Sequence, residues 1–261
     1  MLAKGTSMPH AEIVKTRIID VVPFRRNEPA PAPQAITTFA WTTPPVSIVE
    51  EVQLLDEPDA RLVVLRAPDS PQARAYRLLQ HRLTAQGEPR VFAVTSAARG
   101  EGKTTCAANL ALVLSEESLS RVLLVEANLV RPGVAELFGF EPADSFMTKL
   151  LRSEDAAPPH AVASVSQIRL QLAAVHPDVA HGKRVDRTLL AEALRELKNS
   201  YDYIVLDCVA ASESADATSV CACADAAVVV ARAGKSRKAD LHKTVEQLLP
   251  ARVAGVVLID T

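Results

Sequence analysis

The chain has 261 residues, of which 48% are hydrophobic, and its formal net charge is -2. This length accommodates one sizeable α/β domain with a tail and is too short for two such domains. The small net charge creates no global field that would attract nucleic acid, so we expect no nucleic-acid partner.

Two further properties bear on where the protein works. No apolar run approaches the roughly 20 residues that cross a bilayer, and the N-terminus lacks the apolar segment of a secretory signal. The cysteines form no CxxC pair, so we expect small buried residues of a reduced, cytoplasmic protein; they are Cys106, Cys208, Cys221 and Cys223.

The first 58 residues are expected to lie outside the core as an N-terminal tail. Prolines punctuate residues 27–45, which predicts an extended, disordered linker. Before it, the sequence IVKTRIIDVVP at 13–23 mixes apolar and charged residues. It is either a short docking strand or an ordinary solvated tail. The folded domain is therefore expected to span residues 59–261.

Two elements are expected at the start of this domain. The sequence RLVVLR at 61–66 is typical of a short edge strand. A helix then begins at Asp69-Ser70-Pro71, with Ser70 as its N-cap and Pro71 in its first turn, and it ends near Gly87. Because this helix precedes the first central strand, we expect it to pack outside the sheet.

The strongest motif is VTSAARGEGKTTCAA at 94–108. An apolar strand enters it and an Ala-rich helix leaves it, which is the setting of a phosphate-binding loop. Ala97 stands where the strict pattern has glycine. The loop predicts Mg·ATP binding, with Lys103 at the phosphates and Thr104 on Mg²⁺. The expected nucleotide contacts are Ala98, Arg99, Gly100, Glu101, Gly102, Lys103, Thr104, Thr105 and, further along, Arg131.

The rest of the domain alternates strands with helices. Expected strands are 121–125, 168–175, 203–206, 226–231 and 253–259, and expected helices are 104–117, 134–140, 145–152, 186–200 and 241–249, with loops at 156–159 and 176–183. This order predicts a doubly wound, mainly parallel sheet between two helix layers. Ligands bind at the carboxyl ends of such strands. The loop of Lys103, Glu126 and Asp207 all fall there, so we expect Lys103, Glu126 and Asp207 to be catalytic, and Thr104, Glu126 and Asp207 to hold Mg²⁺.

Four stretches together resemble the ATPase domain of bacterial tyrosine kinases that act in capsule and exopolysaccharide synthesis. They are DSPQARAYRLLQHRL, TSAARGEGKTTCAANLA, VLLVEANLVRP and YDYIVLDCVA. The resemblance runs from about residue 61 to the end, and it extends more distantly to MinD/ParA-type ATPases. It implies a P-loop NTPase fold, with the second stretch as Walker A and the last as Walker B.

The chain departs from the family pattern at several positions. Glu126 and Asn128 stand where the family has aspartates. The opening helix has lost part of the arginine pattern for ring assembly. Autophosphorylating members carry a terminal tyrosine cluster, whereas this chain stops at Thr261 with three tyrosines that we expect to be packing residues: Tyr76, Tyr201 and Tyr203.

Three functions therefore stay open. The resemblance first implies an ATP-binding regulator of polysaccharide synthesis or export with weak or no kinase activity. It would lie at the inner face of the cell membrane through a membrane chain-length (co-polymerase) partner, and a homo-oligomer is one possible form. The second is an active tyrosine kinase acting on that partner. The third is a positioning ATPase of the MinD/ParA type, but the lysine of that class is replaced by Ala98.

Overall fold

The structure is a computed structural model that describes residues 46–85, 87–116, 120–142, 160–180, 184–249 and 251–260. The segment at 13–23, the linker predicted over 27–45, the helix expected over 145–152 and the loop at 156–159 lie outside these residues. Within the described chain, no helix combines the length and the apolar character needed to span a membrane.

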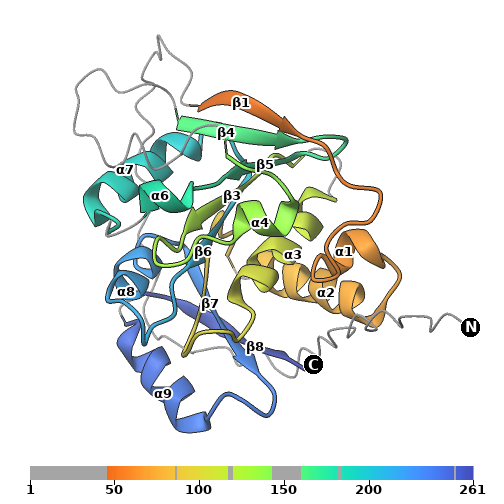
Figure 1. Cartoon of the computed structure of the whole chain (residues 1–261). Helices are drawn as coiled ribbons and strands as arrows, with labels where there is room; N and C mark the ends of the chain where they lie inside the picture. Colours follow the sequence, from red (N-terminus) through yellow and green to blue (C-terminus); the bar gives the residue numbers. More distant parts are fainter. Residues whose placement is uncertain are drawn as a thin grey trace, which may run out of the picture.

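One eight-stranded sheet runs through the described residues in the order β1-β4-β5-β3-β6-β2-β7-β8 (Figure 1). Neighbouring strands are parallel, except that β4 and β5 are antiparallel. The strands are β1 (Val46–Val52), β2 (Val91–Ser96), β3 (Val122–Ala127), β4 (His160–Val165), β5 (Leu170–Ala173), β6 (Tyr203–Cys208), β7 (Ala226–Arg232) and β8 (Val253–Ile259).

Helices cover both faces of this sheet (Figure 1). Side chains of β2 alternate between two apolar clusters: Phe92 and Val94 join the cluster formed with α2 and α3, and Val91 and Ala93 join the one formed with α7 and α8. The three-layer α/β fold is therefore confirmed. The helices are α1 (Val63–Arg66), α2 (Pro71–Thr84), α3 (Lys103–Ser115), α4 (Val134–Phe138), α6 (Pro177–Ala180), α7 (Arg187–Leu197), α8 (Asp216–Cys221) and α9 (Lys238–Gln247).

The start of α2 follows the predicted chemistry. The Ser70 side chain accepts a hydrogen bond of 3.1 Å from the backbone N–H of Ala73, and Pro71 is the first helical residue. Tyr76 and Leu79 are fully buried in the apolar cluster that α2 shares with α3. The helix therefore lies outside the sheet, as expected.

The strand expected at 61–66 is wrong, because Val63–Arg66 forms the short helix α1. The reason lies in α3, where the fully buried Asn109 accepts from the N–H of Val64 at 3.1 Å and donates to the carbonyl of Arg61 at 2.8 Å. A single carboxamide thus satisfies backbone groups that an edge strand would have paired with a neighbour.

The boundary expected at residue 58 is also too late. Strand β1 (Val46–Val52) pairs in parallel with β4 at the edge of the sheet, so the fold already includes residues before 59. Its side chains are mostly exposed, and Ile48 is 59% exposed. Because burial does not impose an apolar alternation on this edge strand, its sequence carries little strand signal.

Candidate nucleotide-binding site

The loop of residues 97–102 connects the buried strand β2 to the N-terminus of α3. Gly100 and Gly102 adopt φ angles of +74° and +91°, which glycine tolerates without a side-chain penalty. Lys103, the first residue of α3, is only 8% exposed. The loop therefore presents a helix N-terminus and a confined cation to an anion, as phosphate binding requires.

Gly102 is also constrained by space. A Cβ atom at this position would lie 2.7 Å from Cδ1 of Ile259 at the end of β8. The side chain of Ile259 is buried against the loop. Because this contact joins residues far apart in the sequence, no local sequence pattern predicts it.

Glu101 braces the loop from within. Its side chain is 2% exposed, accepts a hydrogen bond of 2.8 Å from the backbone N–H of Ala98, and also accepts one from the hydroxyl of Ser236. Beside it, Nζ of Lys235 donates to the carbonyl oxygens of Arg99 at 2.9 Å and Gly100 at 3.3 Å. The segment after β7 therefore fastens the loop, a role that the sequence did not reveal for Lys235 or Ser236.

Thr104 and Asp207 meet at the carboxyl edge of the sheet. The Thr104 hydroxyl donates a 2.7 Å hydrogen bond to Oδ2 of Asp207, whose side chain is fully buried near the end of β6. A threonine hydroxyl beside a strand-end aspartate is the donor pair that holds Mg²⁺ in P-loop proteins.

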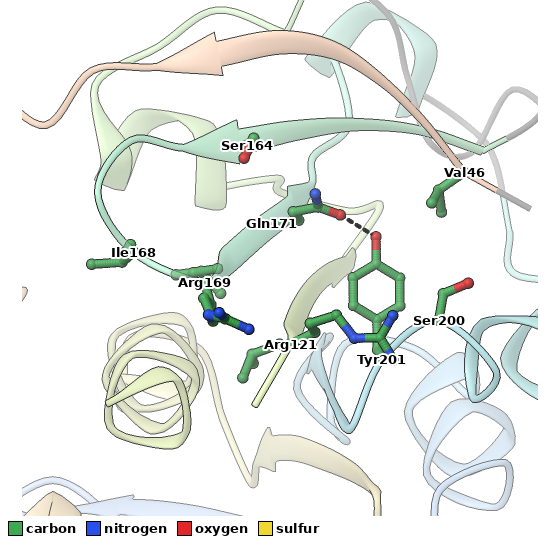
Figure 2. A pocket seen from close by; sticks show the side chains of 10 residues that line it. Val46, Arg121, Ser164, Ile168, Arg169, Gln171, Ser200 and Tyr201 are labelled. Atoms are coloured by element: carbon green, nitrogen blue, oxygen red, sulfur yellow. Dashed lines mark hydrogen bonds between the residues drawn. The ribbon is translucent and has the colours of Figure 1, made fainter. Parts of the chain in front are cut away.

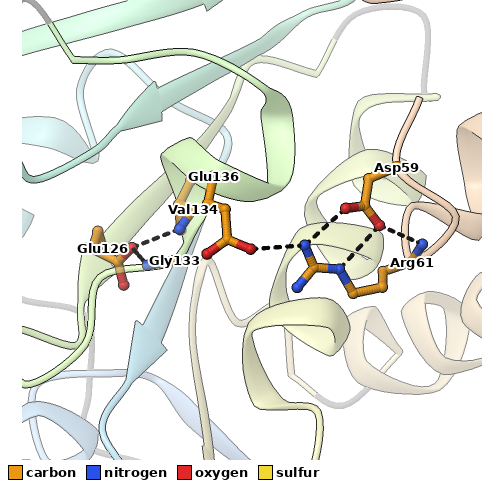
Figure 3. Close-up of polar contacts among 6 residues, drawn as sticks. All are labelled: Asp59, Arg61, Glu126, Gly133, Val134 and Glu136. Carbon is orange, nitrogen blue, oxygen red and sulfur yellow. Dashed lines mark hydrogen bonds and ion pairs between the residues drawn. The ribbon is translucent and has the colours of Figure 1, made fainter. Parts of the chain in front are cut away.

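Glu126 lies beside Asp207, because the two residues are register partners on the adjacent strands β3 and β6. Its Oε2 accepts hydrogen bonds of 2.7 Å from the N–H groups of Gly133 and Val134, at the start of α4 (Figure 3). The glutamate therefore caps α4. A Cβ at Gly133 would lie 3.6 Å from Cγ2 of Thr104, so this turn packs directly against the threonine that is predicted to hold Mg²⁺.

The same short helix connects the site to the first residues of the domain. Glu136 of α4 forms an ion pair of 3.3 Å with Arg61, which is held in turn by Asp59 at 2.7 Å (Figure 3). All three side chains are partly or largely exposed, so their stabilising contribution is small. Helix α4 nevertheless lies between the carboxylates of Glu126 and Asp207 on one side and helix α1 on the other.

Burial dominates the titration of the two carboxyl groups. It raises the pKa of Glu126 well above its ordinary value, and the neighbouring Asp207 charge raises it further. Burial likewise raises the pKa of Asp207 to about 6, although the Thr104 hydroxyl and the Lys103 charge oppose this rise. Two adjacent buried carboxylates without a cation are costly, so the pair favours holding a proton until a cation binds.

The donor set fits Mg²⁺. Oε1 of Glu126 and Oδ1 of Asp207 are buried and have no hydrogen-bond partner among the described residues. The described part of the chain contains no group of three or more His, Cys, Asp or Glu side chains that could enclose a metal. Mg²⁺ suits such a site because it takes one or two carboxylates and fills its remaining positions with water and substrate phosphate oxygens.

Residues after β3 are arranged differently from the family expectation. The Asn128 carboxamide donates to the carbonyl of Arg131 at 2.8 Å and accepts from its N–H at 3.3 Å, so it closes a turn. The side chain of Arg131 is exposed, and a nucleotide contact for it stays a prediction. Asp216, in the first turn of α8, is 7% exposed and pairs with Arg184 at 3.1 Å.

The tyrosines occupy packing positions. Tyr76 is fully buried and Tyr201 is 3% exposed. Tyr203 is half-buried and its ring stacks on Phe92 with centroids 6.3 Å apart. The prediction that these rings serve packing is confirmed by their burial.

Comparison with known proteins agrees with this P-loop architecture. Residues 89–248 match the family model described as "AAA domain". The chain therefore belongs to the AAA domain family.

Individual relatives narrow the resemblance. The chain is 27% identical over 191 residues to "Tyrosine-protein kinase YwqD" of Bacillus subtilis, covering 72% of this chain and 79% of that protein. It is 26% identical over 208 residues to "Succinoglycan biosynthesis transport protein ExoP" of Rhizobium meliloti, covering 76% of this chain but only 26% of that longer protein. The crystal structure of the VpsO kinase domain superposes with a TM-score of 0.60 at 26% identity, covering 71% of this chain and 93% of that domain. The resemblance to bacterial tyrosine kinase domains is thus confirmed.

Proposed function

We propose that this chain is an ATP-binding regulatory subunit of exopolysaccharide or capsule synthesis or export, which docks in a nucleotide-dependent manner on a membrane chain-length (co-polymerase) protein. The observation that carries the proposal is the 2.7 Å contact of Thr104 with Asp207 beneath the loop of Lys103. Relatives named for succinoglycan transport and for tyrosine kinase activity support the polysaccharide setting. We place the protein at the inner face of the cell membrane, held there by its partner.

Each residue of the site has a distinct task in this proposal. The N–H groups at the start of α3 and the Lys103 ammonium bind the phosphates, while Thr104 and Asp207 hold Mg²⁺. Bound Mg·ATP would supply the phosphoryl group of a kinase reaction and the charge that neutralises the buried carboxylates. Glu101 and Lys235 keep the loop in its binding shape.

Weak or absent kinase activity follows from Glu126 near the end of β3 and Asn128 directly after the strand. A kinase needs a carboxylate free to orient or deprotonate the attacking hydroxyl. Here one oxygen of Glu126 is committed to the backbone of α4, and Asn128 is committed to the backbone of Arg131. These residues therefore favour nucleotide binding over rapid transfer.

The second candidate is an active tyrosine kinase that phosphorylates the membrane partner. The fully assembled Thr104 and Asp207 pair favours it, as does the unpartnered Oε1 of Glu126, which leaves one carboxylate oxygen for catalysis. It differs from the regulator only in whether a phosphoryl group leaves ATP.

One experiment separates the two. Purified chain is mixed with Mg·ATP and membrane vesicles containing the chain-length protein, then sedimented and probed for phosphotyrosine. The regulator predicts co-sedimentation that requires Mg·ATP, is lost in Lys103→Ala and persists in the surface control Lys238→Ala, without phosphotyrosine. Phosphotyrosine on the partner that disappears in Lys103→Ala would establish the kinase, and co-sedimentation indifferent to Mg·ATP would refute nucleotide-dependent docking.

A further inference from the structure

A second cavity lies at the edge of the sheet opposite the nucleotide site. It has a volume of about 420 Å³ and opens at the amino ends of β3, β5 and β6, where it is lined by polar residues that include Arg121, Ser164, Arg169, Gln171, Ser200 and Tyr201 (Figure 2). Its size falls in the range of small-molecule pockets, roughly 300–1,000 Å³. The phosphate-binding loop follows the carboxyl end of β2, so a ligand in this cavity would not compete with a nucleotide.

Two arginines are brought together here by strand register. Val122 of β3 pairs with Leu170 of β5, and the N–H of Val122 donates to the carbonyl of Arg169 at 3.0 Å. Arg121 and Arg169 directly precede these two adjacent strands, and both line the cavity. The register therefore brings two cationic side chains to one end of the same cavity.

Among the described residues, only one of these two arginines, Arg121, has a carboxylate close to it. Asp202 lies 3.6 Å from Nε of Arg121, and the same oxygen accepts the Arg121 backbone N–H at 2.8 Å. The guanidinium of Arg169 is exposed and makes no hydrogen bond or ion pair with any described residue. Among the described residues, no carboxylate therefore compensates the Arg169 charge, and its fork-shaped donor is suited to carboxylate or phosphate.

The remaining wall is neutral and partly apolar. The Tyr201 hydroxyl is hydrogen-bonded to the Gln171 carboxamide oxygen (Figure 2). Burial raises the pKa of Tyr201, although the Arg121 charge opposes the rise, so the phenol stays neutral and adds no competing negative charge. The apolar part of the wall is formed by Val46, Val122, Ile168 and Leu170. Such a surface accommodates a compact ring or hydrocarbon body behind an anionic head.

We propose that this cavity binds a small organic anion, a phosphate- or carboxylate-bearing molecule of about one ring, whose anionic group is held by Arg169 and Arg121. Its body packs against Tyr201, and the serine hydroxyls and Gln171 provide hydrogen bonds. The site is separate from the nucleotide site and does not depend on the function proposed above.

Calorimetry on the full chain without nucleotide tests this site. Glucose 1-phosphate and glucuronate serve as phosphate and carboxylate probes, and glucose serves as the uncharged probe. We expect saturable binding of at least one anion and none of glucose. Arg169→Ala should weaken anion binding at least tenfold, and Arg169→Lys less, because lysine keeps the charge but loses the fork.

Two controls make the test specific. Arg195→Ala removes the same charge from an exposed position on α7 that does not line the cavity, and it should leave binding unchanged. Lys103→Ala should abolish ATP binding and retain anion binding. The site is refuted if neither anion binds saturably, if glucose binds as well as the anions, or if Arg195→Ala weakens binding as much as Arg169→Ala.

Discussion

At the scale of single residues, the contacts of the Glu126 carboxylate determine how the site is arranged. An aspartate in its place would end one methylene earlier, whereas the glutamate reaches the N–H groups of Gly133 and Val134 with one oxygen and leaves the other buried beside Asp207. A displacement of about one ångström at a reacting group can lower a rate roughly a hundredfold. The longer side chain therefore links the carboxylate pair to α4, and we expect it to lower any rate of phosphoryl transfer.

The buried carboxyl groups predict an unusual pH dependence of stability. The folded-state pKa of Asp207, about 6, lies above its ordinary unfolded value of about 3.9. Its stabilising contribution is therefore complete below pH 4 and is lost as the pH rises through about 6. Without Mg²⁺, we expect Asp207→Asn to gain stability relative to wild type between pH 4.5 and 7.5, by at most about 3 kcal/mol. Urea unfolding at several pH values measures this, and a pH-independent difference would contradict it.

Gly102 offers a test of local space. Gly102→Ala places a methyl group 2.7 Å from Ile259 at a φ of +91°, whereas the control Gly234→Ala meets the same backbone strain at +71° with nothing within 4 Å. Both should lose about 1 kcal/mol from strain. We expect Gly102→Ala to lose about 1 kcal/mol more and to weaken ATP binding at least tenfold. Gly102→Ala combined with Ile259→Val should recover part of the loss. Equal losses in the two alanine variants would show that Ile259 does not restrict the loop.

At the scale of elements, the connection between β7 and α9 supports the phosphate-binding loop from outside. Lys235 donates to two loop carbonyls, Ser236 holds Glu101, and Nη1 of Arg232 approaches the carbonyl of Gly100 at 3.4 Å. These contacts fix the direction of the carbonyl groups of Arg99 and Gly100 and so restrain the backbone of the loop.

Removal of one support should weaken nucleotide binding without unfolding the protein. Lys235 is exposed, so Lys235→Ala should change the free energy of unfolding by less than about 0.5 kcal/mol. The lost loop contacts should weaken ATP binding about three- to tenfold. Lys238→Ala, at the exposed start of α9, is the matched control. Calorimetry of the two variants is the measurement, and equal affinities would show that Lys235 does not position the loop.

The elements differ in how far sequence predicts them. Buried strands are predictable because they are continuous apolar runs in the sequence. Strand β8, for example, is predicted and found at Val253–Ile259. The sequence pattern does not predict β4 or the six-residue helix α8, and it predicts a strand where α1 lies. These short elements depend on distant partners such as Asn109, which a local pattern does not contain.

At the scale of the whole molecule, the sheet has one polar site at the carboxyl ends of its strands and another at their amino ends. The phosphate-binding loop and the strand-end acids were predictable, because residue type, spacing and strand direction bring Lys103, Glu126 and Asp207 to one edge. Two features were not predictable, because they arise from strand order and register. They are the contacts that Ser236 and Lys235 make with the loop, and the proximity of Arg121 to Arg169.

We expect the loop of Lys103 and the pair of Thr104 and Asp207 to bind Mg·ATP together. Titration calorimetry of the purified chain with ATP, with Mg²⁺ and then with EDTA in its place, tests this directly. We predict saturable binding with Mg²⁺, at least tenfold weaker binding in EDTA, and loss of binding in Lys103→Ala. Absence of ATP binding in the presence of Mg²⁺, or binding that survives Lys103→Ala unchanged, would contradict the claim.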